Sequence, residues 1–185
     1  MMMTRQEAGK YPDCARYLMY EFTKLPDKKP KVYAAFSRYA GSFASMSSMW
    51  GFDPIIKADP YDMMNQCEND GNPEPQKDGS TIQRRSLKWY GFTVPTKGIE
   101  EIYLAPDLME RAGTAEVRAV LEATILHELI HWCRKVAGKD VNDEEPPYAF
   151  EKAAYGKTVE RTWQSCKSEV YFGRRRDVPS VVVDD

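Results

Sequence analysis

The 185-residue chain lacks long apolar runs and a strong excess of either charge, and it has only two histidines. No segment reaches the roughly 20 consecutive apolar residues of a membrane-spanning helix, so no membrane span is expected. The formal net charge of −2 gives no electrostatic basis for binding nucleic acid or an anionic membrane. The first residues lack the apolar segment of a classical secretion signal. We therefore expect that the protein either stays in its cell or leaves by a route that does not read such a signal.

The cysteines are few and show no C-x-x-C pair. Cys14, Cys67, Cys133 and Cys166 are far apart in the sequence, so a cysteine-based zinc site is not expected. An even number of cysteines permits two disulfides, with three possible connectivities, or four buried thiols. The cysteine pattern therefore leaves the redox compartment open.

The length favours one domain over residues 1–185, with residues 173–185 as a flexible tail. Apolar residues at helical spacing predict helices over residues 13–25 and 32–39. A cluster of turn-forming residues predicts a surface loop over residues 69–80. The expected fold class is α+β, mostly helical, with a small sheet or hairpin.

The hairpin is predicted just before the segment that contains the histidines. β-forming residues over 87–94 and 99–104 flank the turn sequence Pro95-Thr96-Lys97-Gly98. Pro106 then suits the first turn of a short helix through Met109. We expect the hairpin to pack beside the helix that follows.

Both histidines lie in the segment His127-Glu128-Leu129-Ile130-His131, inside a predicted helix. Thr114 suits the N-cap of this helix and Gly138 its C-terminal end. Residues i and i+4 share a helix face, so both imidazoles can reach one metal ion. Glu128 lies one residue further round, near enough to exchange a proton with metal-bound water. This HExxH arrangement is typical of zinc peptidases and predicts a Zn²⁺ site.

The third metal ligand is not fixed by this motif. A catalytic zinc site usually takes three protein ligands, and the lack of further histidines leaves a carboxylate or a thiolate. Glu151 is the preferred candidate, because it lies among packing residues on a helix expected to run from near Tyr148 past Trp163. The alternatives are the acidic residues of the preceding loop and two later glutamates, namely Asp140, Asp143, Glu144, Glu145, Glu160 and Glu169.

Tyr155 lies four residues after Glu151 and so on the same helix face. In the expected reaction the metal polarises both water and a carbonyl group, and Glu128 moves the proton from the water to the departing amine. Tyr155 can donate a hydrogen bond to the oxyanion that develops. The alternative is that Tyr155 only packs against its neighbours.

At these residues the chain resembles the glutamate-zincins, the thermolysin-like clan of metallopeptidases. The resemblance covers about thirty residues and implies zinc ligation by His127, His131 and Glu151, with Glu128 as general base. The chain departs from the clan pattern at Tyr155, where an aspartate would support the first histidine. In zincins the strand before the motif helix binds extended substrate, which implies docking along residues 99–104.

More narrowly, the chain resembles the small metallopeptidase domains of bacterial polymorphic toxins and type VI secretion effectors. The shared features are the strand at 99–104, the segment 124–132 and the sequence Phe150-Glu151-x-x-Ala154-Tyr155-Gly156. The resemblance implies a protein or peptide substrate, an antibacterial role in the periplasm of a target cell, and a cognate immunity protein. Two alternatives remain, a zinc amidase or peptidase acting on peptidoglycan and a non-catalytic, zinc-stabilised interaction module.

Overall fold

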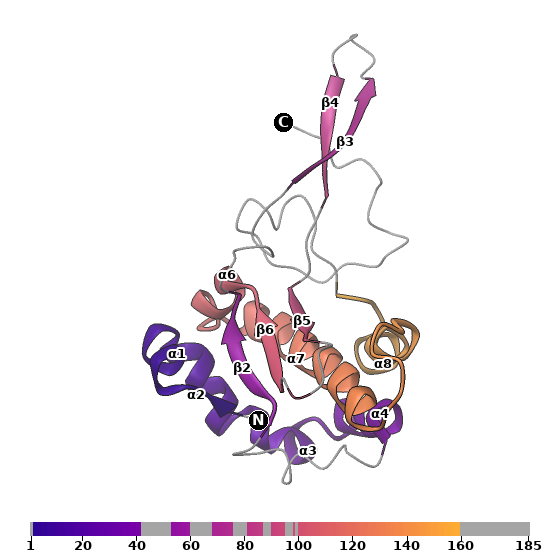
Figure 1. Ribbon diagram of the computed structural model, residues 1–185. Coiled ribbons are helices and arrows are strands. Elements are labelled where there is room, and N and C mark those ends of the chain that lie inside the picture. Colours follow the sequence, from indigo (N-terminus) through magenta and orange to yellow (C-terminus); the bar gives the residue numbers. More distant parts are fainter. Residues whose placement is uncertain are drawn as a thin grey trace.

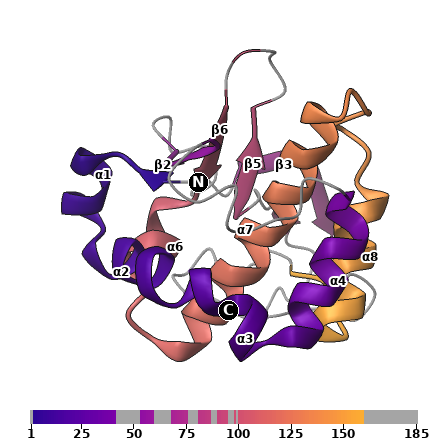
Figure 2. The ribbon, with the colours of Figure 1, turned by 90° about the horizontal axis from the view of Figure 1, so that it is seen from below.

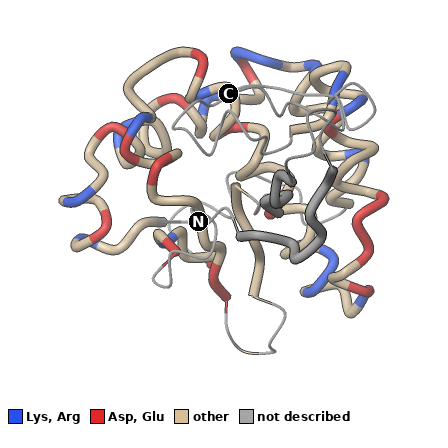
Figure 3. Tube along the Cα trace, turned by 90° about the horizontal axis from the view of Figure 1, so that it is seen from above, with Lys and Arg blue, Asp and Glu red and all other residues tan. Residues whose placement is uncertain are grey.

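The computed structural model describes residues 2–41, 53–59, 68–75, 81–86, 90–94, 98 and 100–159. This part of the chain contains several helices and two small sheets (Figure 1). Basic and acidic residues are interspersed along it (Figure 3). No helix in the described ranges is long and apolar enough to cross a membrane. The expected tail over residues 173–185 lies outside them, and a single domain stays a prediction.

The N-terminal region forms a series of short helices. They are α1 (Arg5–Lys10), α2 (Pro12–Tyr20), the 3-10 turn η1 (Phe22–Lys24), α3 (Leu25–Lys28) and α4 (Pro30–Ala40). Prolines occupy the first turns of α2, α3 and α4, where the missing N–H costs no hydrogen bond. The helix expected over residues 13–25 is divided among α2, η1 and the first residue of α3, whereas the helix at 32–39 lies within α4.

Four short strands form a mixed sheet in the order β1-β2-β6-β5. They are β1 (Met2–Met3), β2 (Ile55–Ala58), β6 (Glu101–Leu104) and β5 (Gly91–Thr93). β2 pairs in parallel with β1 and β6, whereas β5 and β6 are antiparallel with Phe92 opposite Tyr103. The two strands of the expected hairpin are thus present as β5 and β6, whereas residues 87–89, 95–97 and 99 lie outside the described ranges.

The position of β6 corrects the expected docking strand. β6 lies between β2 and β5, so both of its edges are already paired. The prediction that residues 99–104 bind substrate as an edge strand is wrong, because β2 pairs with β6 from a distant part of the sequence. β5, which pairs with β6, is the last strand at its end of the sheet.

A second sheet contains β3 (Glu68–Pro75) and β4 (Thr81–Ser86), which pair antiparallel with a register shift between Asn69 and Pro73. The loop predicted over residues 69–80 is therefore wrong for residues 69–75, and residues 76–80 lie outside the described ranges. Strand pairing overrides the local preference of turn-forming residues, since β-propensity depends strongly on context.

The helix that contains both histidines, α7 (Ala115–Val136), lies at the centre of the fold. The Thr114 side chain accepts a hydrogen bond from the Val117 N–H at its start, and Gly138 follows its end with φ +68°. Helices α4 and α8 (Glu145–Tyr155) lie together along one flank of α7 (Figure 2), and β5 packs against it from the sheet. Apolar residues of α7 join alternate strand residues in one core, namely Leu121, Ile125, Leu129, Ile56, Ala58, Ile102 and Leu104. The α+β class, mostly helical with a small sheet beside the motif helix, is confirmed.

Two further helices flank α7 in the sequence. The short helix expected from Pro106 is α6 (Pro106–Glu110). Helix α8 begins at Glu145 rather than near Tyr148 and ends at Tyr155, followed by Gly156 in the left-handed conformation with φ +73°. The expectation that this helix runs past Trp163 is therefore wrong, because residues 156–159 are described and are not helical.

Candidate metal centre

His127 and His131 converge on one point beside α7. Their Nε2 atoms are 3.2 Å apart, and the ring centroids are 5.0 Å apart. Both side chains are largely buried, at 12% and 7% exposed. The structure therefore brings together the two imidazoles that the i and i+4 spacing places on one helix face.

Glu144 completes a triangle with the two histidines. Its Oε2 atom lies 3.4 Å from Nε2 of His127 and 3.5 Å from Nε2 of His131. Ligands bound tetrahedrally to zinc at about 2.0–2.1 Å lie roughly 3.3–3.4 Å from each other, so these three atoms fit one ion. The Glu144 side chain is 51% exposed, so the group reaches solvent on its side. A catalytic metal site needs such access for water.

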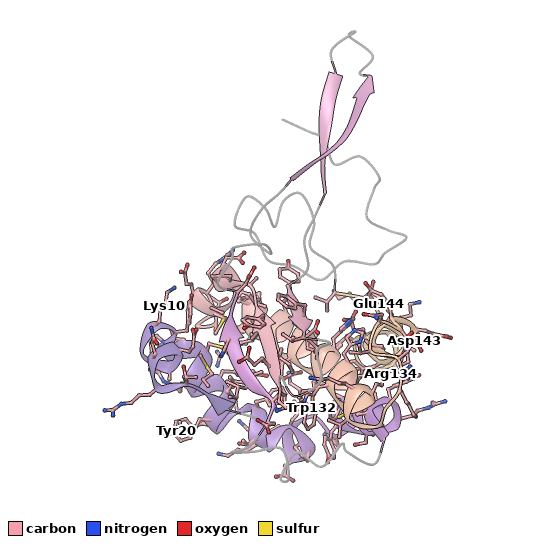
Figure 4. All side chains as sticks on the ribbon, viewed as in Figure 1. Lys10, Tyr20, Trp132, Arg134, Asp143 and Glu144 are labelled. Atoms are coloured by element: carbon pink, nitrogen blue, oxygen red, sulfur yellow. The ribbon has the colours of Figure 1, made fainter. Side chains whose placement is uncertain are left out.

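Arg134, in the last turn of α7, holds the loop that carries Glu144 (Figure 4). Its guanidinium donates to the Asp140 carbonyl at 3.1 Å and to the Asp143 carboxylate at 2.7 Å. Asp143 in turn accepts a hydrogen bond from the backbone N–H of Glu145 at the start of α8. Glu144 is thus fixed between two anchored neighbours, and the acidic loop does fold back to the histidines.

Glu151 lies on the other side of the His127 ring. Its Oε1 atom is 2.7 Å from Nδ1 of His127, and its Oε2 atom accepts the backbone N–H of Val159 at 2.7 Å. The residue is only 1% exposed. Both oxygens therefore have partners away from the Nε2 atoms, and this placement does not fit the expectation that Glu151 is the third ligand. Glu160 and Glu169 lie outside the described residues.

Glu128 is buried beside the histidine pair at 5% exposure. Its Oε2 atom lies 2.9 Å from the hydroxyl oxygen of Thr93 on β5. Burial raises the pKa of the Glu128 carboxyl, although positive charge on the histidines and the Thr93 hydrogen bond oppose the shift. A carboxyl group with a raised pKa takes up a proton more readily, as a general base at neutral pH requires.

The Tyr155 side chain contacts Glu122 and Phe150. Its hydroxyl donates to Oε1 of Glu122 at 3.1 Å, and its ring packs edge-on against Phe150. Burial and the neighbouring Glu122 raise the pKa of the Tyr155 hydroxyl. This environment favours the packing alternative for Tyr155 over hydrogen bonding to a reacting carbonyl.

The charges around His127 stabilise its protonated form. Burial lowers the pKa of this imidazole, but hydrogen bonds with Glu144 and Glu151 and the negative charge of Glu128 together raise it to about 10. Hydrogen bonds with His127 and His131 hold the pKa of Glu144 well below its ordinary value. The carboxylates therefore create a pocket of negative charge that favours a cation at the histidine pair.

Sequence reasoning missed Thr93, Tyr148 and Arg134 as neighbours of this centre. The Tyr148 ring packs edge-on against the His127 ring at 5.3 Å between centroids. The sequence does indicate on which face of β5 Thr93 lies, because side chains alternate along a strand and Thr93 therefore shares a face with Gly91. Of the described cysteines, Cys14 and Cys133 are free and buried and do not belong to the group of His127, His131 and Glu144, whereas Cys67 and Cys166 lie outside the described residues.

Comparison with known proteins identifies the family. A family model described as metallopeptidase toxin 3 matches residues 7–156, and this range contains all of the centre except Val159. The chain therefore belongs to the metallopeptidase toxin 3 family. It is a hydrolase that acts on proteins, and the resemblance to polymorphic-toxin metallopeptidases is confirmed. No curated protein and no solved structure matches the chain.

Proposed function

We propose that this metallopeptidase toxin is zinc-dependent and hydrolyses peptide bonds of proteins in a bacterial target cell. His127, His131 and Glu144 bind the zinc, Glu128 is the general base, and Glu151 orients His127. The observation that carries this proposal is the triangle of Nε2, Nε2 and Oε2 atoms, with sides of 3.2, 3.4 and 3.5 Å, beside a buried glutamate.

The donor set favours zinc over the hard cations. Calcium and magnesium prefer oxygen ligands, whereas two imidazoles and one carboxylate are a common set for catalytic zinc. When bound, zinc would act as a Lewis acid that lowers the pKa of water to about 7 and polarises the substrate carbonyl. Two neutral imidazoles and one carboxylate leave the ion one net positive charge, which suits that chemistry.

Glu128 carries the proton through the reaction. Its carboxylate accepts a proton from the attacking water and delivers it to the amine nitrogen that departs. Its burial at 5% exposure keeps competing solvent away and favours the protonated form that must deliver the proton. The structure therefore supports a base at this position rather than a fourth ligand.

Glu151 acts through His127. A carboxylate on Nδ1 makes that nitrogen the donor and leaves the lone pair of Nε2 for the metal. The 2.7 Å contact with Nδ1 and the 2.7 Å hydrogen bond from the Val159 N–H fix both the tautomer and the carboxylate. Glu151 thus supports His127, a role that the zincin pattern assigns to an aspartate at the position of Tyr155.

Zinc titration of three variants tests the ligand set. We expect Glu151→Gln to weaken zinc binding about 10–100-fold, as loss of a group that orients a ligand does. Glu144→Gln should weaken it more and change the visible spectrum of the cobalt-substituted protein, because a ligand is lost. The matched control is Glu145→Gln, the exposed neighbour, which should bind zinc normally. Normal affinity and spectrum in Glu144→Gln, with both altered in Glu151→Gln, would return the third ligand to Glu151.

Elemental analysis and chelation test the metal. The purified protein should contain about one zinc per chain, as expected for a mononuclear site. Chelation should abolish hydrolysis of unfolded casein, and added zinc should restore it. Restoration by magnesium or calcium instead of zinc would contradict the proposal.

Expression in two compartments tests the antibacterial role and its site of action. The toxin should arrest growth of bacteria when it is directed to the periplasm, whereas the Glu128→Gln variant should be harmless there. If growth were arrested only by cytoplasmic expression, the target would lie in the cytoplasm instead. Incubation with periplasmic proteins and with peptidoglycan distinguishes a protein substrate from the peptidoglycan alternative.

Delivery and self-protection complete the proposal. We propose delivery by a specialised secretion system such as type VI and protection of the producing cell by a cognate immunity protein. Both rest on the resemblance to effector toxins and on membership of a toxin family. Co-expression of a neighbouring gene product that binds the toxin and restores growth would support an immunity partner.

A further inference from the structure

Thr93 links the edge strand β5 to the general base. Its hydroxyl oxygen lies 2.9 Å from Oε2 of Glu128 and 2.8 Å from the backbone carbonyl oxygen of the same residue. Thr93 is 9% exposed, so water competes little for its hydroxyl. Among the described residues, Thr93 is the one that the structure hydrogen-bonds to the Glu128 carboxyl group.

Close packing at Gly91 brings β5 into this position. A Cβ atom added at Gly91 would lie 2.9 Å from Cγ2 of Thr124 and 3.1 Å from Cγ of Glu128. Real Cβ atoms essentially never come as close as the first of these distances, so the strand reaches α7 only because residue 91 has no side chain. Thr93, two residues along and on the same face of the strand, then meets the carboxylate.

We propose that Thr93 is a positioning residue for Glu128, which its hydroxyl holds in the orientation needed to take the proton of the attacking water. The inference rests on the proposed function, in which Glu128 is the base. It adds a residue on a different element, which the HExxH motif does not contain.

The chemistry of a hydroxyl group suits this role. A threonine hydroxyl has one proton to donate and lone pairs to accept with. It can donate to Oε2 while Glu128 is a carboxylate. Once Glu128 has taken the proton from water, the hydroxyl can accept from Glu128 and donate to the backbone carbonyl. The 2.9 and 2.8 Å contacts supply both arrangements without movement of the strand.

Three variants of the zinc-loaded full chain test the inference. Thr93→Val removes the hydroxyl at nearly constant volume, and Thr93→Ser keeps it. Thr124→Val is the matched control, because Thr124 lies one turn before Glu128 and its buried hydroxyl has no hydrogen-bond partner in the described structure. Thr93→Ala serves if Thr93→Val does not fold.

The expected kinetic effect is on turnover. For unfolded, dye-labelled casein, kcat should fall about 10–100-fold in Thr93→Val, the size expected for a lost hydrogen bond to a charged group. KM and zinc content should stay near those of the wild type. Thr93→Ser should recover kcat to within about threefold, and Thr124→Val should remain within about threefold, as expected where no hydrogen bond is lost. A wild-type kcat in Thr93→Val would overturn the inference.

Carbon-13 NMR of the glutamate carboxyl groups gives a readout that does not depend on activity. The signal missing from Glu128→Gln identifies Glu128. That signal should move in Thr93→Val and stay in place in Thr93→Ser and Thr124→Val; no movement in Thr93→Val overturns the inference for any substrate. The two proposals fail separately, because full activity of Glu128→Gln refutes the general base, whereas an inactive Glu128→Gln beside a normal Thr93→Val refutes Thr93 alone.

Discussion

Two buried glutamates on α7, Glu122 and Glu128, have very different partners. Glu122 is 2% exposed and accepts hydrogen bonds from the Tyr17 hydroxyl at 2.8 Å, the Tyr155 hydroxyl at 3.1 Å and the Lys29 ammonium at 2.9 and 3.0 Å. Glu128 is 5% exposed, and Thr93 is the partner that the described residues give its carboxyl group. In the described structure, Glu122 thus has three hydrogen-bond donors, one of them a cation, whereas the carboxyl group of Glu128 has one neutral donor.

This difference in hydrogen-bond partners distinguishes a glutamate that stabilises the fold from one that is suited to proton transfer. The partners of Glu122 come from α2, the start of α4 and α8, so its carboxylate connects helices that are far apart in the sequence. The carboxyl group of Glu128 has fewer donors, and burial raises its pKa. A buried carboxylate with several donors holds together the elements that supply them, whereas one whose pKa is raised by burial takes up a proton more readily.

The largest expected effect is loss of hydrolysis in Glu128→Gln. Removal of the base should lower kcat by a factor of about 10² to 10⁴, since general base catalysis contributes that much. The variant should keep its zinc and unfold at a temperature equal to or above that of the wild type, because an amide costs less to bury than a carboxylate. Hydrolysis of casein, elemental analysis and thermal denaturation check this. Activity within tenfold of the wild type would contradict the assignment.

Glu122→Ala should give the opposite result. The free energy of unfolding should fall by about 2–4 kcal/mol, because two buried tyrosine hydroxyls lose their acceptor. Urea denaturation measures this. The folded fraction should retain its zinc and its kcat to within a few-fold, and equal stability of variant and wild type would show that Glu122 does not hold the helices together.

Zinc binding should release a proton from His127. Its pKa is raised from 6.5 to about 10, so before metal binds its interactions with Glu144 and Glu151 stabilise the fold fully below about pH 6.5. That contribution is lost as the pH rises through about 10. Zinc needs the neutral imidazole, so binding at pH 8 should release about one proton, and affinity should rise up to about tenfold per pH unit. Calorimetry in buffers of different ionisation enthalpy counts the protons, and affinity independent of pH from 7 to 9 would contradict the raised pKa.

Tyr155→Phe should have the smallest effect. Loss of one hydroxyl donor to Glu122 should cost about 1 kcal/mol of stability and leave kcat unchanged. Denaturation and hydrolysis assays together decide between packing and catalysis. A kcat at least tenfold lower, with unchanged stability, would restore the role expected from the position of Tyr155 on its helix.

The sequence predicts best where the information is local. His127, Glu128 and His131 form a recognisable group because one helix sets their relative positions, and Thr114 and Gly138 mark its ends. The roles of Glu144 and Glu151 were harder to assign. Which of two glutamates faces Nε2 and which faces Nδ1 depends on how the loop after α7 turns, and Arg134 decides this through Asp140 and Asp143.

Long-range strand pairing also lies beyond local patterns. The sequence predicts the β5–β6 hairpin because a short turn joins its strands, but β2 pairs with β6 across a long stretch of intervening chain. This pairing covers the second edge of β6, so that β5, which carries Thr93, is the edge strand at that end of the sheet.

The fold class, the motif helix and the convergence of its two imidazoles thus follow from periodicity, caps and the i, i+4 spacing, because each depends on residues within a few turns of one another. Tertiary structure decided the rest: the edge strand, the hydrogen-bond partner of Glu128, and the contrast between Glu122 and Glu128. Each of these depends on contacts between elements that are far apart in the sequence, and the last two depend on donors brought to a buried carboxylate, which is costly to leave unpaired.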